Sequence, residues 1–236
     1  ALRRRFGSLE AFEVPAEPRE LCVVLLHGYG ADGADLVPVA AQTPGRGSLR
    51  WIFPEAPFPL DSSPFSSGRQ WFPIDEEALL ACQRSGESID LSAQDPPGLR
   101  QAAARVLELA EGAGLDWDRV VLGGFSQGAM VAFEAAVQAP AAPAGLALFS
   151  GNLIAENRWR QAAAARKGVP FFQSHGRADP ILGFQGALRL ERLLREAGLR
   201  GGLSPFDGGH GIGAEVLEGF GSFLDSLREG IAPSRP

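Results

Sequence analysis

The sequence is poor in cysteine and in the residue groupings that bind metals. Its 236 residues include two cysteines, Cys22 and Cys82, which are too few for a disulfide framework. Cys22 stands inside an apolar run, so we expect it to pack as a small buried hydrophobe. No set of histidines and cysteines has the spacing of a zinc site, and the sequence therefore predicts no metal.

Positive charge is also scarce. Lysine and arginine together number 22 against 28 acidic residues, which gives a net charge of −6, and Lys167 is the single lysine. A nucleic-acid partner would require clustered basic residues to meet its phosphates, so this class of partner is excluded. The one basic cluster, Arg3-Arg4-Arg5, is expected to be a solvated N-terminal tip.

Long hydrophobic runs are absent as well. No apolar stretch approaches the roughly 18 residues that a transmembrane helix needs. No signal peptide is recognisable in the sequence, although a leader removed before Ala1 stays open. The default expectation is a cytoplasmic protein.

Short apolar runs alternate with longer amphipathic stretches along the whole chain. The runs expected to be strands are 21–26, 49–53, 120–125, 145–149, 169–173 and, more weakly, 202–206. Helical periodicity falls between them, around 99–109, 127–139, 187–197 and 212–223. Because strands alternate with helices of this length, the sequence predicts one α/β domain over 1–236 with a mainly parallel sheet.

The strongest local motif is Gly124-Phe125-Ser126-Gln127-Gly128, which has the G-x-S-x-G form of a nucleophile elbow. An apolar run ends directly before it and an Ala-rich stretch begins directly after it. This is the strand, turn and helix that the motif requires, because only a tight turn exposes the serine hydroxyl to a base and a substrate. Ser126 is therefore the predicted nucleophile.

The base must be one of three histidines, since a serine hydroxyl is a poor nucleophile without one. In this fold the order along the chain is serine, acid, histidine. His27 precedes Ser126, and His175 would need Glu134 or Glu156 as its acid. His210 lies in the glycine-rich loop 208–213 and is the better choice.

The acid must orient His210 and stabilise its imidazolium form. The acidic residues between serine and histidine are Glu134, Glu156, Asp179, Glu191, Glu196 and Asp207. Asp179 follows the predicted strand 169–173 and so stands at the carboxyl edge of the sheet, where such sites form. The others belong to helices or surface segments, and Asp207 is too close to His210 in sequence. The predicted triad is Ser126, Asp179 and His210.

Two further groups of residues complete the predicted site. The backbone N–H groups of Gln127, directly after the nucleophile, and of Tyr29, in the turn His27-Gly28-Tyr29-Gly30, are expected to bind the oxyanion. The segment 58–72 is expected to form one wall of the acyl site, with Trp71 and Phe72 contacting the acyl group. The alternative is that these aromatic side chains only hold a long loop against the core.

Several motifs together resemble those of the acyl-protein thioesterase/carboxylesterase family, also called phospholipase/carboxylesterase. They are LLHGYGADG (25–33), FPEAP (53–57), GRQWF (68–72), GGFSQGA (123–129), FSG (149–151), SHGRADP (174–180) and GGHGI (208–212). The resemblance covers nearly the whole chain and implies a small α/β-hydrolase with little or no cap. It implies the same triad and oxyanion donors, a carboxylic ester or thioester substrate and no cofactor, and it allows a homodimer.

The sequence departs from the family after Trp71-Phe72, where Pro73 replaces the acidic residue that is often found there. Residues 76–97 also have a sequence of their own, which puts substrate size in doubt more than reaction type. One alternative function is a lactone or dienelactone-type hydrolase, although those typically use cysteine as nucleophile. The other is a non-catalytic hydrolase-fold binding protein, which predicts that a triad member is missing.

Overall fold

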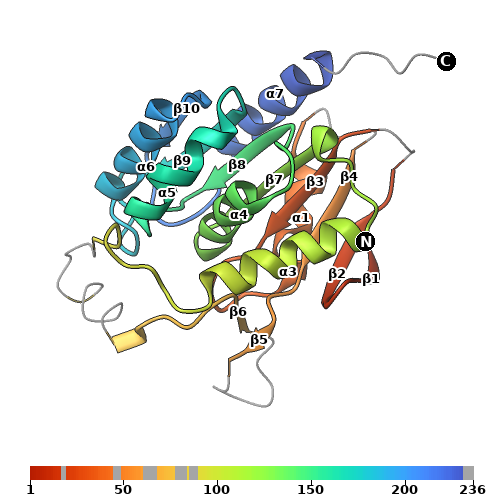
Figure 1. The fold of residues 1–236 in the computed structure, drawn as a ribbon, viewed down its shortest axis with the longest axis horizontal. Coiled ribbons are helices and arrows are strands. Elements are labelled where there is room, and N and C mark those ends of the chain that lie inside the picture. The colour runs from red at the N-terminus through yellow and green to blue at the C-terminus, as the bar shows by residue number, and fades with distance from the viewer. Residues whose placement is uncertain (17–19, 45–48, 61–67, 78–83, 85–89, 231–236) are drawn as a thin grey trace.

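The computed structural model describes residues 1–16, 20–44, 49–60, 68–77, 84 and 90–230 (Figure 1). Its centre is an eight-stranded sheet. In order across the sheet, the strands are β1 (Leu2–Phe6), β2 (Leu9–Val14), β4 (Arg50–Pro54), β3 (Cys22–Leu26), β7 (Val120–Phe125), β8 (Gly145–Phe149), β9 (Pro170–Gly176) and β10 (Arg200–Phe206). From β4 to β10 all neighbours are parallel, and β1 and β2 add an antiparallel edge.

Helices cover both faces of the sheet. One face carries α3 (Leu99–Gly112), α4 (Gln127–Gln138), α5 (Glu156–Ala162) and α6 (Phe184–Glu196), and the other carries α1 (Val37–Gln42) and α7 (Ala214–Gly230). Figure 1 shows α3, α4 and α5 in front of the strands. Short 3₁₀ helices span Gly33–Leu36, Trp117–Arg119 and Ala163–Arg166, and a small hairpin joins β5 (Phe58–Pro59) to β6 (Arg69–Gln70). Within the described residues, no helix combines the length and the apolar character needed to cross a membrane.

Strand β3 shows why a continuous apolar run forms a central strand. Cys22, Val24 and Leu26 pack into the core under α3 and α4, whereas the alternating Val23 and Leu25 pack into the core under α1 and α7. Both faces of the strand are therefore buried, as the absence of polar residues predicts. Burial also raises the pKa of the Cys22 thiol to about 12, so Cys22 behaves as the buried hydrophobe that was expected. Cys82 lies outside the described residues.

The predicted α/β fold with a mainly parallel sheet is confirmed, and the six expected strands are present with shifts of a few residues at their ends. The N-terminal hairpin of β1 and β2 was missed. The run Arg3-Arg4-Arg5 is solvent-exposed as expected, but it lies in the edge strand β1 instead of a loose tip. Its side chains approach Glu10, Glu13 and Glu55, so the strand is held by charge and backbone pairing and has little apolar burial.

The topology brings two loops together at the carboxyl edge of the sheet. The chain leaves β3 for β4 on one side and returns to β7 on the other, so β3 and β7 lie at a switch point, where ligands bind in open α/β sheets. The turn after β7 leads straight into α4, which passes over the end of β3. A Cβ on Gly128 would lie 2.0 Å from the carbonyl oxygen of Leu26.

This close crossing should make Gly128 intolerant of a side chain. We expect Gly128→Ala to lower the free energy of unfolding by about 3 kcal/mol or more, because backbone atoms cannot yield to a methyl group. Gly230→Ala is the matched control, since Gly230 is also helical and its Cβ would meet nothing within 4 Å. Urea denaturation of both variants measures the effect, and equal stability of the two would contradict it.

Candidate functional site

Ser126 stands on the sharp turn between β7 and α4. Its backbone adopts φ 55° and ψ −117°, a left-handed conformation that non-glycine residues rarely accept. The turn is held by the Ser126 N–H, which donates to Phe149 O at 2.9 Å, and by the Ser126 carbonyl, which accepts from the Ala129 N–H at 3.0 Å. The predicted nucleophile elbow is therefore present, and it directs the serine side chain toward a cavity.

The structure brings together the predicted acid and base. His210 Nδ1 lies 2.7 Å from Asp179 Oδ2. The other carboxylate oxygen, Oδ1, accepts the backbone N–H groups of Ile181 at 2.8 Å and Leu182 at 2.9 Å. Burial by itself would raise the pKa of Asp179, but hydrogen bonds from His175 and His210 outweigh it and hold the pKa well below its ordinary value. Asp179 is therefore a carboxylate at neutral pH.

The imidazole of His210 lies beside the elbow. Its ring centroid is 4.8 Å from that of Phe125, the residue before the serine, and both His210 and Ser126 line the same cavity. Among the described residues, the Ser126 hydroxyl has no hydrogen-bond partner. Such contacts are often long in the free enzyme and tighten once substrate is bound.

The two predicted oxyanion donors reach the same cavity from different elements. Tyr29 follows β3, and Gln127 is the first residue of α4. Neither backbone N–H donates to another described residue, so both are available to a ligand. The loop after β3 is fixed from outside, because Gly30 N–H donates to Arg69 O and Arg69 N–H donates to Ala31 O, each at 2.9 Å. The Tyr29 hydroxyl also donates to the Glu76 carboxylate.

His27, the last residue before this loop, braces it as the sequence suggested. Its Nε2 accepts the Ala56 N–H at 3.0 Å, so Nδ1 must carry the proton, which it donates to Gly28 O at 2.7 Å. The side chain is fully buried. Burial lowers the pKa of His27, which keeps the ring neutral and the acceptor in place.

The structure does not bring Trp71 to the cavity, which corrects the prediction that it contacts the acyl group. Its side chain is fully buried, and its indole N–H donates to the carbonyl of His27 at 2.9 Å. The ring packs 5.5 Å from the His27 ring. The alternative considered from sequence, in which this aromatic residue holds the loop against the core, describes Trp71 correctly, because the indole needs a buried acceptor for its N–H.

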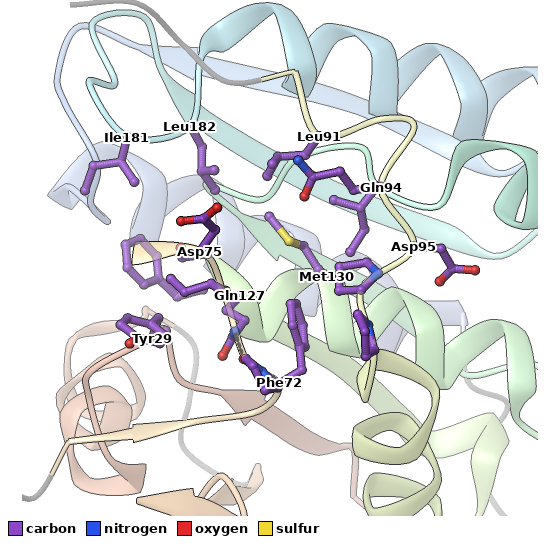
Figure 2. A pocket seen from close by; sticks show the side chains of 18 of the residues that line it. Tyr29, Phe72, Asp75, Leu91, Gln94, Asp95, Gln127, Met130, Ile181 and Leu182 are labelled. Carbon is purple, nitrogen blue, oxygen red and sulfur yellow. Dashed lines mark hydrogen bonds between the residues drawn. The ribbon is translucent and has the colours of Figure 1, made fainter. Parts of the chain in front are cut away.

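Phe72, by contrast, does line the cavity (Figure 2). It is held there by the side chain of Gln127, whose Nε2 donates to Phe72 O and whose Oε1 accepts the Trp71 N–H, both at 2.8 Å. Gln127 therefore lines the cavity, where its backbone N–H is the predicted oxyanion donor, and its side chain ties the cavity wall to the elbow. Sequence reasoning identified the first of these functions and missed the second.

The cavity has a volume of about 610 Å³ and is mostly apolar, with a smaller share of polar groups that includes Ser126. Figure 2 shows the labelled side chains of Leu91, Met130 and Leu182 gathered around it. The wall predicted over 58–72 contributes only Phe72 among its described members, since 61–67 lie outside the described residues. The segment 73–75 contributes more residues to this wall of the cavity, and the segment 91–97 forms another wall. The apolar Leu91 and the adjacent prolines 96 and 97 were the available signal.

Arg158 on α5 anchors this second wall. It bonds Asp95 through two nitrogens, at 2.6 and 3.0 Å, and Glu134 on α4 at 2.5 Å. Backbone N–H groups at the start of α5 add bonds to the carbonyls of Ser92 and Gln94.

Within the described ranges, no group of three His, Cys, Asp or Glu side chains lies close enough to hold a metal ion.

The neutral state of His27 predicts how stability depends on pH. The folded state keeps the ring unprotonated, whereas the unfolded chain takes up a proton below about pH 6.5, so the free energy of unfolding falls as pH falls. Between pH 6.5 and 5, we expect it to fall up to about 1.4 kcal/mol per pH unit more steeply for the wild type than for His27→Gln, which offers an uncharged acceptor.

Chemical denaturation at several pH values measures the two slopes. The depressed pKa of Asp179 also lowers stability in acid, but only below about pH 5 and equally in both proteins. The difference between the two slopes from pH 6.5 to 5 therefore reports His27. Parallel slopes for the two proteins would contradict the assignment of His27 as a neutral acceptor.

Comparison with known proteins places this geometry in a family. A family model described as phospholipase/carboxylesterase matches residues 9–228. The acyl-protein thioesterase 1 of Eremothecium gossypii is 29% identical over 231 residues, which covers 93% of each chain. The crystal structure of esterase PE8 is 28% identical, with a TM-score of 0.75 and coverage of 93% of this chain and 99% of that one.

A Bacillus cereus carboxylesterase is 17% identical with a TM-score of 0.72, covering 94% of this chain and 95% of that one, and supports the fold. These findings favour ester hydrolysis over the lactonase and the non-catalytic alternatives. The chain belongs to the phospholipase/carboxylesterase family, and it is a hydrolase of the esterase and thioesterase type with an α/β-hydrolase fold.

Proposed function

We propose that Ser126, His210 and Asp179 act as the catalytic triad of this hydrolase and cleave an acyl ester or thioester through an acyl-enzyme. The observation that carries the proposal is the 2.7 Å contact between His210 Nδ1 and Asp179 Oδ2 beside a strained serine turn. In a triad the acid fixes the tautomer and orientation of the histidine, and this contact leaves His210 Nε2 to face the serine.

The reaction would proceed in two halves. His210 Nε2 takes the proton of the Ser126 hydroxyl as Oγ attacks the carbonyl carbon, and the N–H groups of Tyr29 and Gln127 stabilise the oxyanion. The tetrahedral intermediate collapses, and the departing alcohol or thiol receives the proton from His210. A water molecule, activated by His210, then attacks the acyl-enzyme, and the carboxylic acid is released with Ser126 restored.

The shape of the cavity supports a substrate with an apolar acyl group. Its lining is dominated by apolar side chains such as Phe72, Leu91, Met130 and Ile154, and Ser126 and His210 line the same cavity. Ligand sites typically combine an apolar surface with a few polar groups that orient the reacting atoms. The similarity to the acyl-protein thioesterase 1 of Eremothecium gossypii supports thioesters as substrates alongside oxygen esters.

Removal of the nucleophile tests the triad. We expect Ser126→Ala to lower kcat for p-nitrophenyl ester and acyl thioester hydrolysis by several orders of magnitude, leaving the residual catalysis of the oxyanion donors. The variant should keep the melting temperature of the wild type, because Ala fits the same space. Turnover near the wild-type value would remove Ser126 from its proposed role.

The acyl wall is tested by comparing two neighbouring aromatic residues. We expect Phe72→Ala to lower kcat/KM more for octanoyl than for acetyl esters, since each methylene that loses its burial is worth about 0.8 kcal/mol. Trp71→Ala should instead lower the melting temperature and reduce kcat/KM alike for all chain lengths, because Trp71 supports the loop from behind. A uniform loss for Phe72→Ala would show that it does not contact the acyl group.

A further inference from the structure

His175 is the third histidine of the chain, and the reaction described above assigns it no role. It is the second-to-last residue of β9, just before the loop that carries Asp179, and its side chain is fully buried. It lines no part of the cavity, and on its other side the ring packs 6.2 Å from the Phe184 ring of α6. His175 therefore cannot touch a substrate and can act only through its neighbours.

One nitrogen of His175 contacts both the proposed acid and the loop that bears it. Nε2 lies 2.6 Å from the carbonyl oxygen of Leu182 and 3.1 Å from Asp179 Oδ2. A carbonyl oxygen can only accept a hydrogen bond, so Nε2 carries a proton. That N–H donates to Leu182 O, and it also lies close enough to Asp179 Oδ2 to help lower the pKa of that carboxyl.

With this contact, the Asp179 carboxylate has a donor group near each of its acceptor positions. Oδ1 accepts the N–H groups of Ile181 and Leu182, Oδ2 accepts from His210, and His175 Nε2 lies 3.1 Å from the same Oδ2. A carboxylate has about four lone-pair sites, so three bonds and this fourth contact restrict both its rotation and its position. The contact from His175 is to the same oxygen that holds the proposed base.

We infer that His175 is a positioning residue that holds Asp179 Oδ2 in place for His210. This inference rests on the proposed triad and adds a member that neither approaches the substrate nor transfers a proton. By binding Leu182 O with the same N–H, His175 also fixes the loop in which Ile181 and Leu182 line the cavity. Without that donor, Oδ2 would be held by His210 alone.

Two substitutions separate the N–H from the bulk of the ring. His175→Gln places an amide N–H near the position of Nε2, whereas His175→Phe keeps the ring and removes the donor. We expect His175→Phe to lower kcat about 10- to 100-fold with KM nearly unchanged, as for loss of a hydrogen bond to a charged group, and His175→Gln to recover most of it. If His175→Phe does not fold, His175→Asn replaces it, because its shorter side chain cannot reach Asp179.

A double-mutant cycle shows whether the effect passes through Asp179. The rate at which a fluorophosphonate probe labels Ser126 is measured for His175→Phe, Asp179→Asn and the double variant, per amount of folded protein. A positioning role predicts that His175→Phe slows labelling in the wild type and has almost no further effect beside Asp179→Asn. The same factor in both backgrounds, or a His175→Gln variant as slow as His175→Phe, would overturn the inference.

The cycle also distinguishes this inference from the proposed function. If Asp179→Asn labels and turns over at the wild-type rate, the triad itself fails, and the inference falls with it. If Asp179→Asn is impaired but His175→Phe turns over at the wild-type rate, the triad stands and the role of His175 alone is refuted.

Discussion

The whole site depends on one close backbone crossing, where the first turn of α4 passes over the end of β3. The Cβ that Gly128 lacks would lie 2.0 Å from Leu26 O, and a Cβ on Gly28 would lie 3.5 Å from that of Ser126. The loop after β3 and the serine turn are therefore in direct contact. Because of this contact, Tyr29, Ser126 and Gln127 line one cavity, as the proposed oxyanion site requires. Preorganised donors of this kind need no rearrangement when charge develops.

The hydrolase class was predictable from the sequence because the elbow depends on local patterns and the proposed acid and base depend on chain order and sheet topology. The elbow motif needs a strand before it and a helix after it, and both are visible as local patterns around Ser126. The acid and base then follow from chain order and from the position of Asp179 and His210 in loops at one edge of a parallel sheet, where topology brings them together. The structure accordingly places His210 Nδ1 2.7 Å from Asp179 Oδ2.

What the sequence did not reveal depends on which way a side chain faces within irregular backbone. Trp71 and Phe72 are adjacent, so they point in different directions, and only the bonds to His27 and Gln127 decide which of them lines the cavity. His175 was passed over because the sequence holds no sign that its strand extends far enough to bring it beside Asp179. The N-terminal hairpin was missed because Arg3-Arg4-Arg5 has no buried face, and its strand is specified by its partner.

Hydrogen-bonded polar groups fix the described walls of the cavity. Its walls come from segments far apart in sequence, and each is tied to the helical layer by hydrogen bonds: Phe72 by Gln127, and the segment around Asp95 by Arg158 and the buried Glu134. Gln127 and Glu134 are buried and would be costly to leave unpaired, whereas Asp95 is exposed and is held by its two bonds from Arg158. The reacting groups depend on the sheet and the walls depend on these ties. Changes within 73–75 or 91–97 can therefore alter the proposed acyl site while the contact between Asp179 and His210 stays the same.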